Sequence, residues 1–261
     1  MNKQGAMNRL KRFRLALPIA IIGLMAIGAH AQNQDDATGA TIFQAAGPNA
    51  SSIQGTVEQF RVALGGHQEI NWDGMGSTAT TLSPTPLDNF LSTRGARFTT
   101  PGSGFVQAPA SGLATVFGNP SYATIFKAFS PVRLFSPIGS NVTDTFFFVP
   151  GSGEEATTRA FGVVFSDIDL PDGSGPGAKR GNRHASTLIE YFSADGEVLF
   201  SSFAPASPGD GNLTFFGIVF DDARIARVRI TAGATPGPDD SGLLDVVMMD
   251  DFIFGQPQRI Q

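Results

Sequence analysis

The sequence predicts an all-β fold, an antiparallel β-sandwich of jelly-roll type with about ten or more strands. Short runs rich in Phe, Val and Ile recur between clusters of Gly, Pro, Asp and Ser, and no long stretch after residue 31 has a convincing helical period. Residues 226–231 alternate between apolar and polar, as in a strand with one face in water. Asp195-Gly196 separates two β-rich runs and suits a tight turn, which predicts a hairpin over residues 187–203.

The first 31 residues have the three parts of a secretory signal peptide. A basic stretch ending at Arg14 precedes an apolar run over residues 15–28 and the triplet Ala29-His30-Ala31, which predicts cleavage before Gln32. A transmembrane anchor is the alternative, but the run is shorter than the roughly 20 residues that span a bilayer, and it contains Pro18. We therefore expect a secreted or periplasmic protein with no membrane span in the mature chain.

The rest of the chain is expected to form one folded unit. Residues 32–52 are small, polar and aperiodic and predict a flexible N-terminal arm, with a first strand that packs late as the alternative. Residues 53–256 predict a single β-sandwich domain, and residues 257–261 a short C-terminal tail. The expected strands are 57–64, 97–100, 104–107, 142–149, 159–168, 187–192, 197–203, 214–220, 225–231 and 245–254.

Runs that are apolar on both faces predict central strands, and turn residues predict the connections. Residues 146–149 and 215–220 are apolar on both faces and are expected to be central strands. Residues 78–91 are expected to form a turn-rich connection with a single helical turn at 87–91, and residues 171–186 a long loop.

The composition limits the classes of function. The chain has no Cys, so neither disulfides nor a zinc-thiolate centre can hold the fold. Removal of residues 1–31 leaves 13 basic and 23 acidic residues, a net charge of −10, which makes nucleic acid a poor partner. Seventeen of the acids are Asp, a residue that caps turns and ligates calcium, which makes Ca²⁺ the candidate structural cofactor.

No sequence motif predicts catalysis. The H-E-x-x-H, G-x-S-x-G and G-x-x-x-x-G-K-[ST] signatures are all absent. His67 is either a turn residue or a ligand, and His184 belongs to a basic loop. Glu154-Glu155 lies in a Gly-rich turn and does not predict the pair of carboxyl groups, about 5 to 9.5 Å apart, that glycoside hydrolysis needs. We therefore expect no catalytic residues, with a secreted glycoside hydrolase as the least favoured function.

Two pairs of aspartates are candidate metal ligands. Asp167 and Asp169 stand at a predicted strand end and, at this spacing, leave the same face about 7 Å apart. They could share a Ca²⁺ ion, but acceptance of turn N–H groups is the favoured role. Asp250 and Asp251 interrupt an apolar strand, so one of them needs a partner, because burial of an unpaired carboxylate costs several kcal/mol.

Several segments resemble those of a set of secreted bacterial proteins. They are Ile70-Asn71-Trp72-Asp73-Gly74, Arg133-Leu134-Phe135, and residues 94–102, 139–144, 148–151, 161–169, 216–220 and 246–253. The resemblance covers residues 65–256 and implies a lectin-like or galactose-binding-like β-sandwich with no established activity. Some of these proteins carry a C-terminal Pro-Glu-Pro sorting tail, which we do not expect here.

The resemblance also implies a metal site. In similar carbohydrate-binding sandwiches, an acid on the last strand often joins an acid near the first strand around a structural calcium ion. The matching set here is Asp251 with Asp73 or Glu69. A carboxylate that is paired with Arg or lies in water is an equally weighted alternative.

The favoured function is an extracellular module that binds a glycan or cell-surface polymer. Sugar sites usually present Trp or Tyr faces, so the expected ligand-binding residues are Trp72, Tyr122 and Tyr191. A structural or matrix protein of the envelope that associates with itself through strand edges is the alternative.

Overall fold

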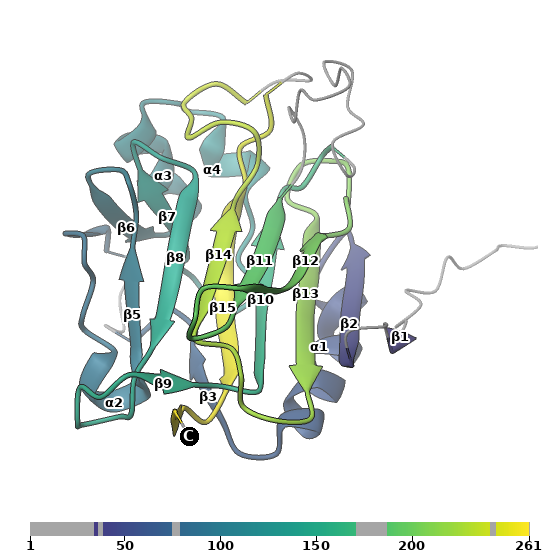
Figure 1. The fold of residues 1–261 in the computed structure, drawn as a ribbon. Helices are drawn as coiled ribbons and strands as arrows, with labels where there is room; N and C mark the ends of the chain where they lie inside the picture. Colours follow the sequence, from purple (N-terminus) through teal and green to yellow (C-terminus); the bar gives the residue numbers. More distant parts are fainter. Residues whose placement is uncertain (1–33, 36–38, 75–78, 171–186, 241–243, 261) are drawn as a thin grey trace, which may run out of the picture.

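Two antiparallel sheets packed face to face form the body of the protein (Figure 1). This computed structural model describes residues 34–35, 39–74, 79–170, 187–240 and 244–260. The larger sheet consists, in spatial order, of β1 (Gln34–Asp35), β2 (Ala40–Gly47), β13 (Leu213–Phe220), β10 (Ala160–Ser166), β15 (Met248–Gly255), β7 (Leu134–Ile138), β6 (Gly104–Ala108) and β4 (Thr81–Ser83), and β3 (His67–Ile70) also pairs with β15.

The smaller sheet has five strands. In spatial order they are β12 (Val198–Phe203), β11 (Leu188–Phe192), β14 (Arg227–Thr231), β8 (Val142–Phe147) and β5 (Ala96–Thr99). A separate two-stranded pair joins β9 (Ala156–Thr157) to β16 (Gln258–Arg259). The predicted all-β antiparallel sandwich is therefore confirmed, while its jelly-roll connectivity stays a prediction.

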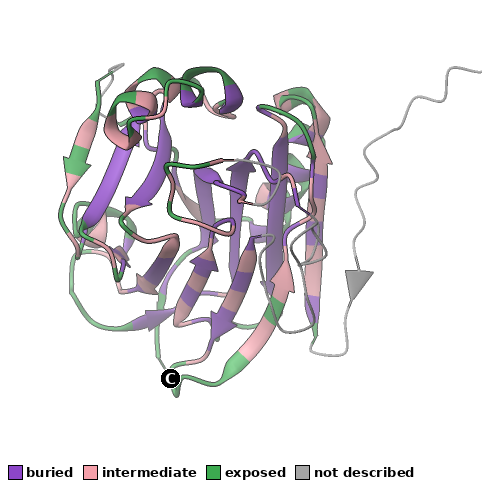
Figure 2. Ribbon diagram, turned by 90° about the horizontal axis from the view of Figure 1, so that it is seen from above, coloured by how far each residue is buried: buried purple, intermediate pink, exposed green. Residues whose placement is uncertain are grey.

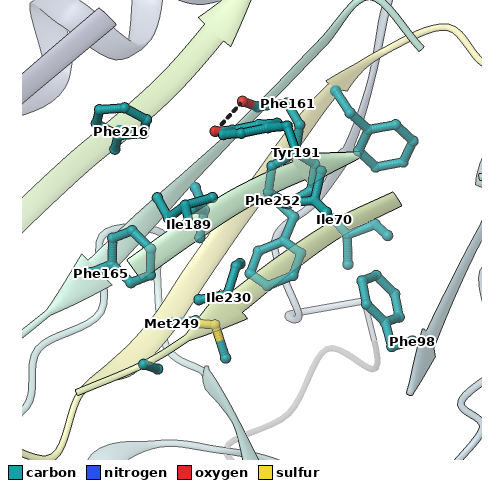
Figure 3. Close-up of a cluster of buried hydrophobic side chains, with 14 of the residues drawn as sticks. Ile70, Phe98, Phe161, Phe165, Ile189, Tyr191, Phe216, Ile230, Met249 and Phe252 are labelled. Carbon is teal, nitrogen blue, oxygen red and sulfur yellow. Dashed lines mark hydrogen bonds between the residues drawn. The ribbon is translucent and has the colours of Figure 1, made fainter. Parts of the chain in front are cut away.

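Aromatic and branched side chains fill the space between the sheets. Phe161 and Phe165 of β10 belong to one buried cluster with Ile189 and Tyr191 of β11 and Ile230 of β14 (Figure 3). The Tyr191 hydroxyl donates a hydrogen bond to the Phe161 carbonyl oxygen at 3.3 Å. Buried residues run along the strands of both sheets (Figure 2), as expected where each sheet covers the other.

Helices cover the outer face of the larger sheet. In α1 (Ala50–Leu64), Ile53, Val57, Phe60 and Leu64 are buried at helical spacing and pack on β2, β13 and β10. Asn49 caps this helix by accepting a hydrogen bond from the Ser52 N–H at 3.1 Å. The short helices α3 (Ala110–Phe117) and α4 (Tyr122–Ile125) lie over β6, β7 and β15, and their buried side chains form a third cluster.

Two predictions near the N-terminus are wrong. Residues 57–64 were expected to be a strand, but they form the second half of α1, because their apolar side chains line one face of a helix. Residues 32–52 were expected to be a flexible arm, but β2 pairs with β13 along its entire length, so the alternative of an early strand holds for residues 40–47. The predicted helical turn at 87–91 is displaced to α2 (Leu91–Arg94).

Most other predicted strands are confirmed within a few residues of their bounds. The hairpin predicted over residues 187–203 is β11 and β12, which pair from Leu188 with Phe203 to Phe192 with Val198. The alternating segment is β14, and the run at 215–220 lies in the fully buried β13. The predicted signal peptide and the loop at 171–186 lie outside the described residues. No helix within the described ranges is long and apolar enough to cross a membrane.

Candidate functional site

Asp250 and Asp251 lie at an irregularity in the centre of the larger sheet. The register between β10 and β15 passes from Phe165 opposite Met249 to Val163 opposite Phe252, which leaves the two aspartates opposite Val164 alone. This is the geometry of a β-bulge, which redirects side chains that would otherwise alternate between faces. Both carboxylates are almost completely buried.

Asp250 holds the segment that enters β7. Its Oδ2 accepts hydrogen bonds from the Phe129 and Ser130 N–H groups at 2.6 and 3.2 Å. The Ser130 hydroxyl lies 3.1 Å from Asp250 Oδ1 and 3.2 Å from Asp73 Oδ2, and Asp73 Oδ1 accepts from the Arg133 N–H at 2.9 Å. Burial, reinforced by the charge of Asp251, raises the pKa of Asp250 well above its ordinary value.

Asp251 is paired with an arginine. Arg61 of α1 places its Nη2 3.3 Å from Asp251 Oδ2 and 2.6 Å from Glu69 Oε1. Burial raises the pKa of Asp251 to about 6, with the nearby charge of Glu69 adding to the increase. The Oδ1 atom of Asp251 is buried and has no hydrogen-bond partner.

The structure therefore divides the predicted metal ligands between two separate groups of contacts. Asp251 and Glu69 converge on Arg61, which is the arginine-paired alternative of the sequence analysis, and Asp73 approaches Asp250 through Ser130 instead of approaching Asp251. Among the described residues, no three Asp, Glu, His or Cys side chains are grouped to hold a metal ion as they stand. The guanidinium of Arg61 supplies the positive charge at this position.

A pocket of about 260 Å³ opens beside this network, where β3 ends. Its buried floor is formed by Ile70, Trp72 and Gln107. The walls and the exposed rim consist of Glu69, Asn71, Gly74, Asn89, Phe90 and Arg94. A carboxylate, three carboxamides and a guanidinium thus surround a small volume that also borders two aromatic rings.

Unpaired hydrogen-bond donors lie below the floor of this pocket. Arg133 is fully buried, and its Nη2 donates to the Gln107 carbonyl oxygen at 2.9 Å, but its Nε and Nη1 have no partner. The Trp72 Nε1 is also buried and unpartnered. Burial lowers the pKa of Arg133, although the charge of Asp73 opposes this effect. Buried donors without partners are costly, so these three atoms are an unfavourable feature at this end of the sandwich.

The three aromatic residues predicted to contact ligand lie in the core. The Trp72 ring stacks on Phe135 with centroids 3.8 Å apart, and Trp72, although only 2% exposed, is one of the residues that line the pocket. Tyr122 donates to the Pro238 carbonyl oxygen at 2.9 Å, and Tyr191 lies between the sheets. None of these three rings offers an exposed face, because the cores on both sides of the larger sheet bury them.

Asp167 and Asp169 accept hydrogen bonds from a turn, as the favoured interpretation expects. Asp167 Oδ1 accepts from the Gly211 N–H at 3.1 Å, and Asp169 Oδ1 accepts from the Gly209 N–H at 2.8 Å. Asp167 has a φ of 74°, a left-handed conformation that is unfavourable for a residue with a Cβ atom. Two further acids, Asp240 and Asp245, reach the same corner from the segment between β14 and β15.

The remaining polar candidates do not line the pocket. His67 is half-buried on β3, with its Nε2 3.7 Å from Glu69 Oε2, and His184 lies outside the described residues. Glu154 pairs with Arg259 near a second, charged concavity of about 540 Å³ that Arg224 and Asp222 help to line.

Sequence reasoning missed Arg61, Ser130, Asn89, Arg94 and Gln107. Only the spacing of Ile53, Val57, Phe60 and Leu64 around Arg61 could have signalled that this arginine lies on a helix facing the sheet. Comparison of the chain with protein-family models, curated proteins and solved structures found no match.

Proposed function

We propose that the protein is an exported, non-catalytic β-sandwich that binds an extracellular glycan or cell-surface polymer. The pocket between Glu69, Asn89, Arg94 and Gln107 is the observation that carries this proposal. Planar carboxylate, carboxamide and guanidinium groups can form paired hydrogen bonds with the vicinal hydroxyls of a sugar. The volume suits one small unit of a polymer better than a large cofactor.

The apolar part of the pocket supports the same assignment. Phe90 is half-buried and its ring meets the Trp72 ring edge-to-face, with centroids 5.6 Å apart, so it is held in place without being fully covered. An aromatic ring beside hydroxyl-binding side chains can contact the C–H face of a sugar. Phe90 therefore takes the role that the sequence analysis gave to the Trp and Tyr residues.

Glycan-array and polysaccharide pull-down measurements with the processed protein test this function. Asn89→Ala and Arg94→Ala each remove an exposed rim group, and each should weaken binding by about tenfold. Arg224→Ala, in the separate charged concavity, is the matched control and should bind like the unaltered protein. If the unaltered protein binds no glycan class at all, the function is rejected. If Arg224→Ala is the only variant that loses binding, this pocket is rejected as the binding site.

Self-association is a second candidate function, because β12 is an unusual edge strand. It ends the smaller sheet, its six residues carry no charge, and Val198 is 57% exposed. Natural edge strands are commonly protected by charged side chains. Light scattering after size exclusion should detect oligomers that Val198→Lys abolishes, whereas a strict monomer at high concentration would reject this candidate.

A further inference from the structure

Four carboxylates from two stretches of the chain lie close together where β10 ends. Asp167 and Asp169 follow β10 and bind the turn at Gly209 and Gly211, as described above. Asp245 Oδ1 lies 3.4 Å from the Asp169 N–H, and Asp240 Oδ1 accepts from the Val246 N–H at 3.1 Å. Each carboxylate thus uses one oxygen to hold backbone.

The other oxygen of Asp245 has no partner. Asp245 is only 1% exposed, and its Oδ2 is buried without any hydrogen bond. Asp169 and Asp240 lie close enough to interact electrostatically with it. A buried carboxylate oxygen that lies near other carboxylates and lacks a donor is unfavourable unless a proton or a cation joins it.

Two other buried carboxylates of the protein have positive partners, whereas the buried Asp250 accepts hydrogen bonds from backbone N–H groups and Ser130. Asp144 accepts two hydrogen bonds from Arg229, at 2.9 and 2.8 Å, and Asp251 is paired with Arg61. Within the described part of the chain, no Lys or Arg forms an ion pair with any of the four acids at the end of β10. Lys127 packs its methylene groups near Gly211 but forms no such pair.

We propose that this corner is a Ca²⁺ site in which Asp245 is the central ligand, with Asp169, Asp240 and Asp167 as the remaining carboxylates. An all-oxygen set is the chemistry that Ca²⁺ prefers, and the ion takes six to eight oxygens at about 2.3 to 2.6 Å. The four side chains do not yet surround one point. Asp169 and Asp240 are half-buried. Ca²⁺ sites also take backbone carbonyl groups and water as ligands.

The buried charges give the ion a role in stability. Asp167 and Asp245 are both 1% exposed. A divalent cation would offset the negative charge of these carboxylates and link Asp167 and Asp169 to Asp240 and Asp245. This site is independent of the glycan pocket.

Calorimetric titration and thermal unfolding of the processed protein test the proposal, with CaCl₂ added after exhaustive EDTA dialysis. We expect one bound Ca²⁺ per chain, a higher Tm at about 5 mM CaCl₂, and little effect of equal MgCl₂. Asp245→Asn and Asp169→Asn should each weaken Ca²⁺ binding by about tenfold or more. Asp195→Asn, on the exposed β11–β12 turn, is the matched control and should respond like the unaltered protein.

The Tm of Asp245→Asn in EDTA separates a lost ligand from a failed fold. Asn keeps the oxygen that faces the Asp169 N–H and removes the buried charge, so this variant should unfold at or above the Tm of the unaltered protein in EDTA and gain nothing from CaCl₂. An unaltered protein that shows neither binding heat nor a change in Tm with CaCl₂ would overturn the proposal. A Ca²⁺ response of equal size in Asp245→Asn and Asp169→Asn would also overturn it.

Discussion

At the scale of single residues, the pairing of Arg61 with Asp251 gives a direct prediction. The Asp251 side chain is 2% exposed, so removal of the guanidinium leaves a buried carboxylate without its positive partner. Arg61→Met keeps the packing of the aliphatic stem and should lower the free energy of unfolding by about 3 kcal/mol at pH 8. The double variant with Asp251→Asn should recover part of this loss in urea unfolding.

A surface ion pair provides the control for these Arg61 and Asp251 variants. Arg224 contacts Asp222, and both side chains are more than 40% exposed, so Arg224→Met should cost less than about 1 kcal/mol. Equal losses in Arg61→Met and Arg224→Met, or a double variant that loses the full sum of its two single changes, would contradict the pairing argument.

The same aspartate predicts a pH dependence of stability. The pKa of Asp251 in the folded protein is about 6, above its ordinary 3.8, because of burial and the proximity of Glu69, while Ser130 opposes the increase. The folded state therefore keeps a proton that the unfolded chain releases near pH 4. This contribution favours folding below pH 4 and is lost as the pH rises through 6.

Urea unfolding between pH 4 and pH 7 measures this contribution. Asp251→Asn has no proton to release, so its free energy of unfolding should fall less steeply than that of the unaltered protein, by up to about 1.4 kcal/mol per pH unit between pH 4 and 6. Asp195→Asn should follow the unaltered protein over the whole range. Parallel curves for Asp251→Asn and the unaltered protein would exclude a raised pKa at this residue.

The need of Asp250 and Asp251 for partners could be predicted from the sequence, but the partners could not. An apolar strand containing two acids implies burial, and burial implies compensation. Arg61 lies 190 positions away along the chain on a segment expected to be a strand, so nothing local connected it with Asp251. Asp240 and Asp245 reach Asp167 only through tertiary folding, for the same reason.

At the scale of elements, the strands were predictable and the helices were not. Alternation and Asp-Gly turns identify β14 and the β11–β12 hairpin, because both signals lie within a few residues. In α1, the Ser, Gly and Thr content lowers helix propensity, and the run from Val57 to Leu64 has the apolar density of a strand. Packing on the sheet overrides this preference, as the spacing of the buried residues of α1 indicates.

The close packing of α1 on the sheet depends on two glycines, one on β10 and one on β13, that lie opposite each other. Gly162 and Gly217 are paired in register, and a Cβ atom on either one would lie 2.9 Å from a ring carbon of Phe60. Gly162→Ala should therefore lower the free energy of unfolding by about 1–3 kcal/mol through overpacking, as measured by urea unfolding.

A glycine in the same helix provides the matched control. Gly55 is exposed, and a Cβ atom there would meet nothing within 4 Å. Gly55→Ala should raise the free energy of unfolding by about 0.5–1 kcal/mol, because it restricts the unfolded chain and removes a glycine from a helix interior. A neutral Gly162→Ala would mean that Phe60 can move aside without loss of packing.

At the scale of the whole molecule, the position of β2 decides where the folded domain begins. β2 lies inside the larger sheet between β1 and β13, all eight of its residues are paired with β13, and Ala40, Phe43 and Ala45 are buried. Its loss would open a long edge on β13 and uncover the cluster beneath α1. A chain lacking residues 1–48, which still keeps Asn49 and all of α1, should therefore lose cooperative thermal unfolding or aggregate.

The matched truncation removes residues 1–38 and leaves β2 intact. It should unfold cooperatively, with a Tm close to that of the chain that begins at Gln32, because β1 contributes only a two-residue pairing with β2. Equal Tm values for the two truncated chains would mean that the sandwich closes without β2, as expected if residues 32–52 were a dispensable arm. A difference between the two Tm values would instead mean that β2 belongs to the cooperative core. The reason is that α1 can bury Phe60 against Phe43 only when β2 is in the sheet.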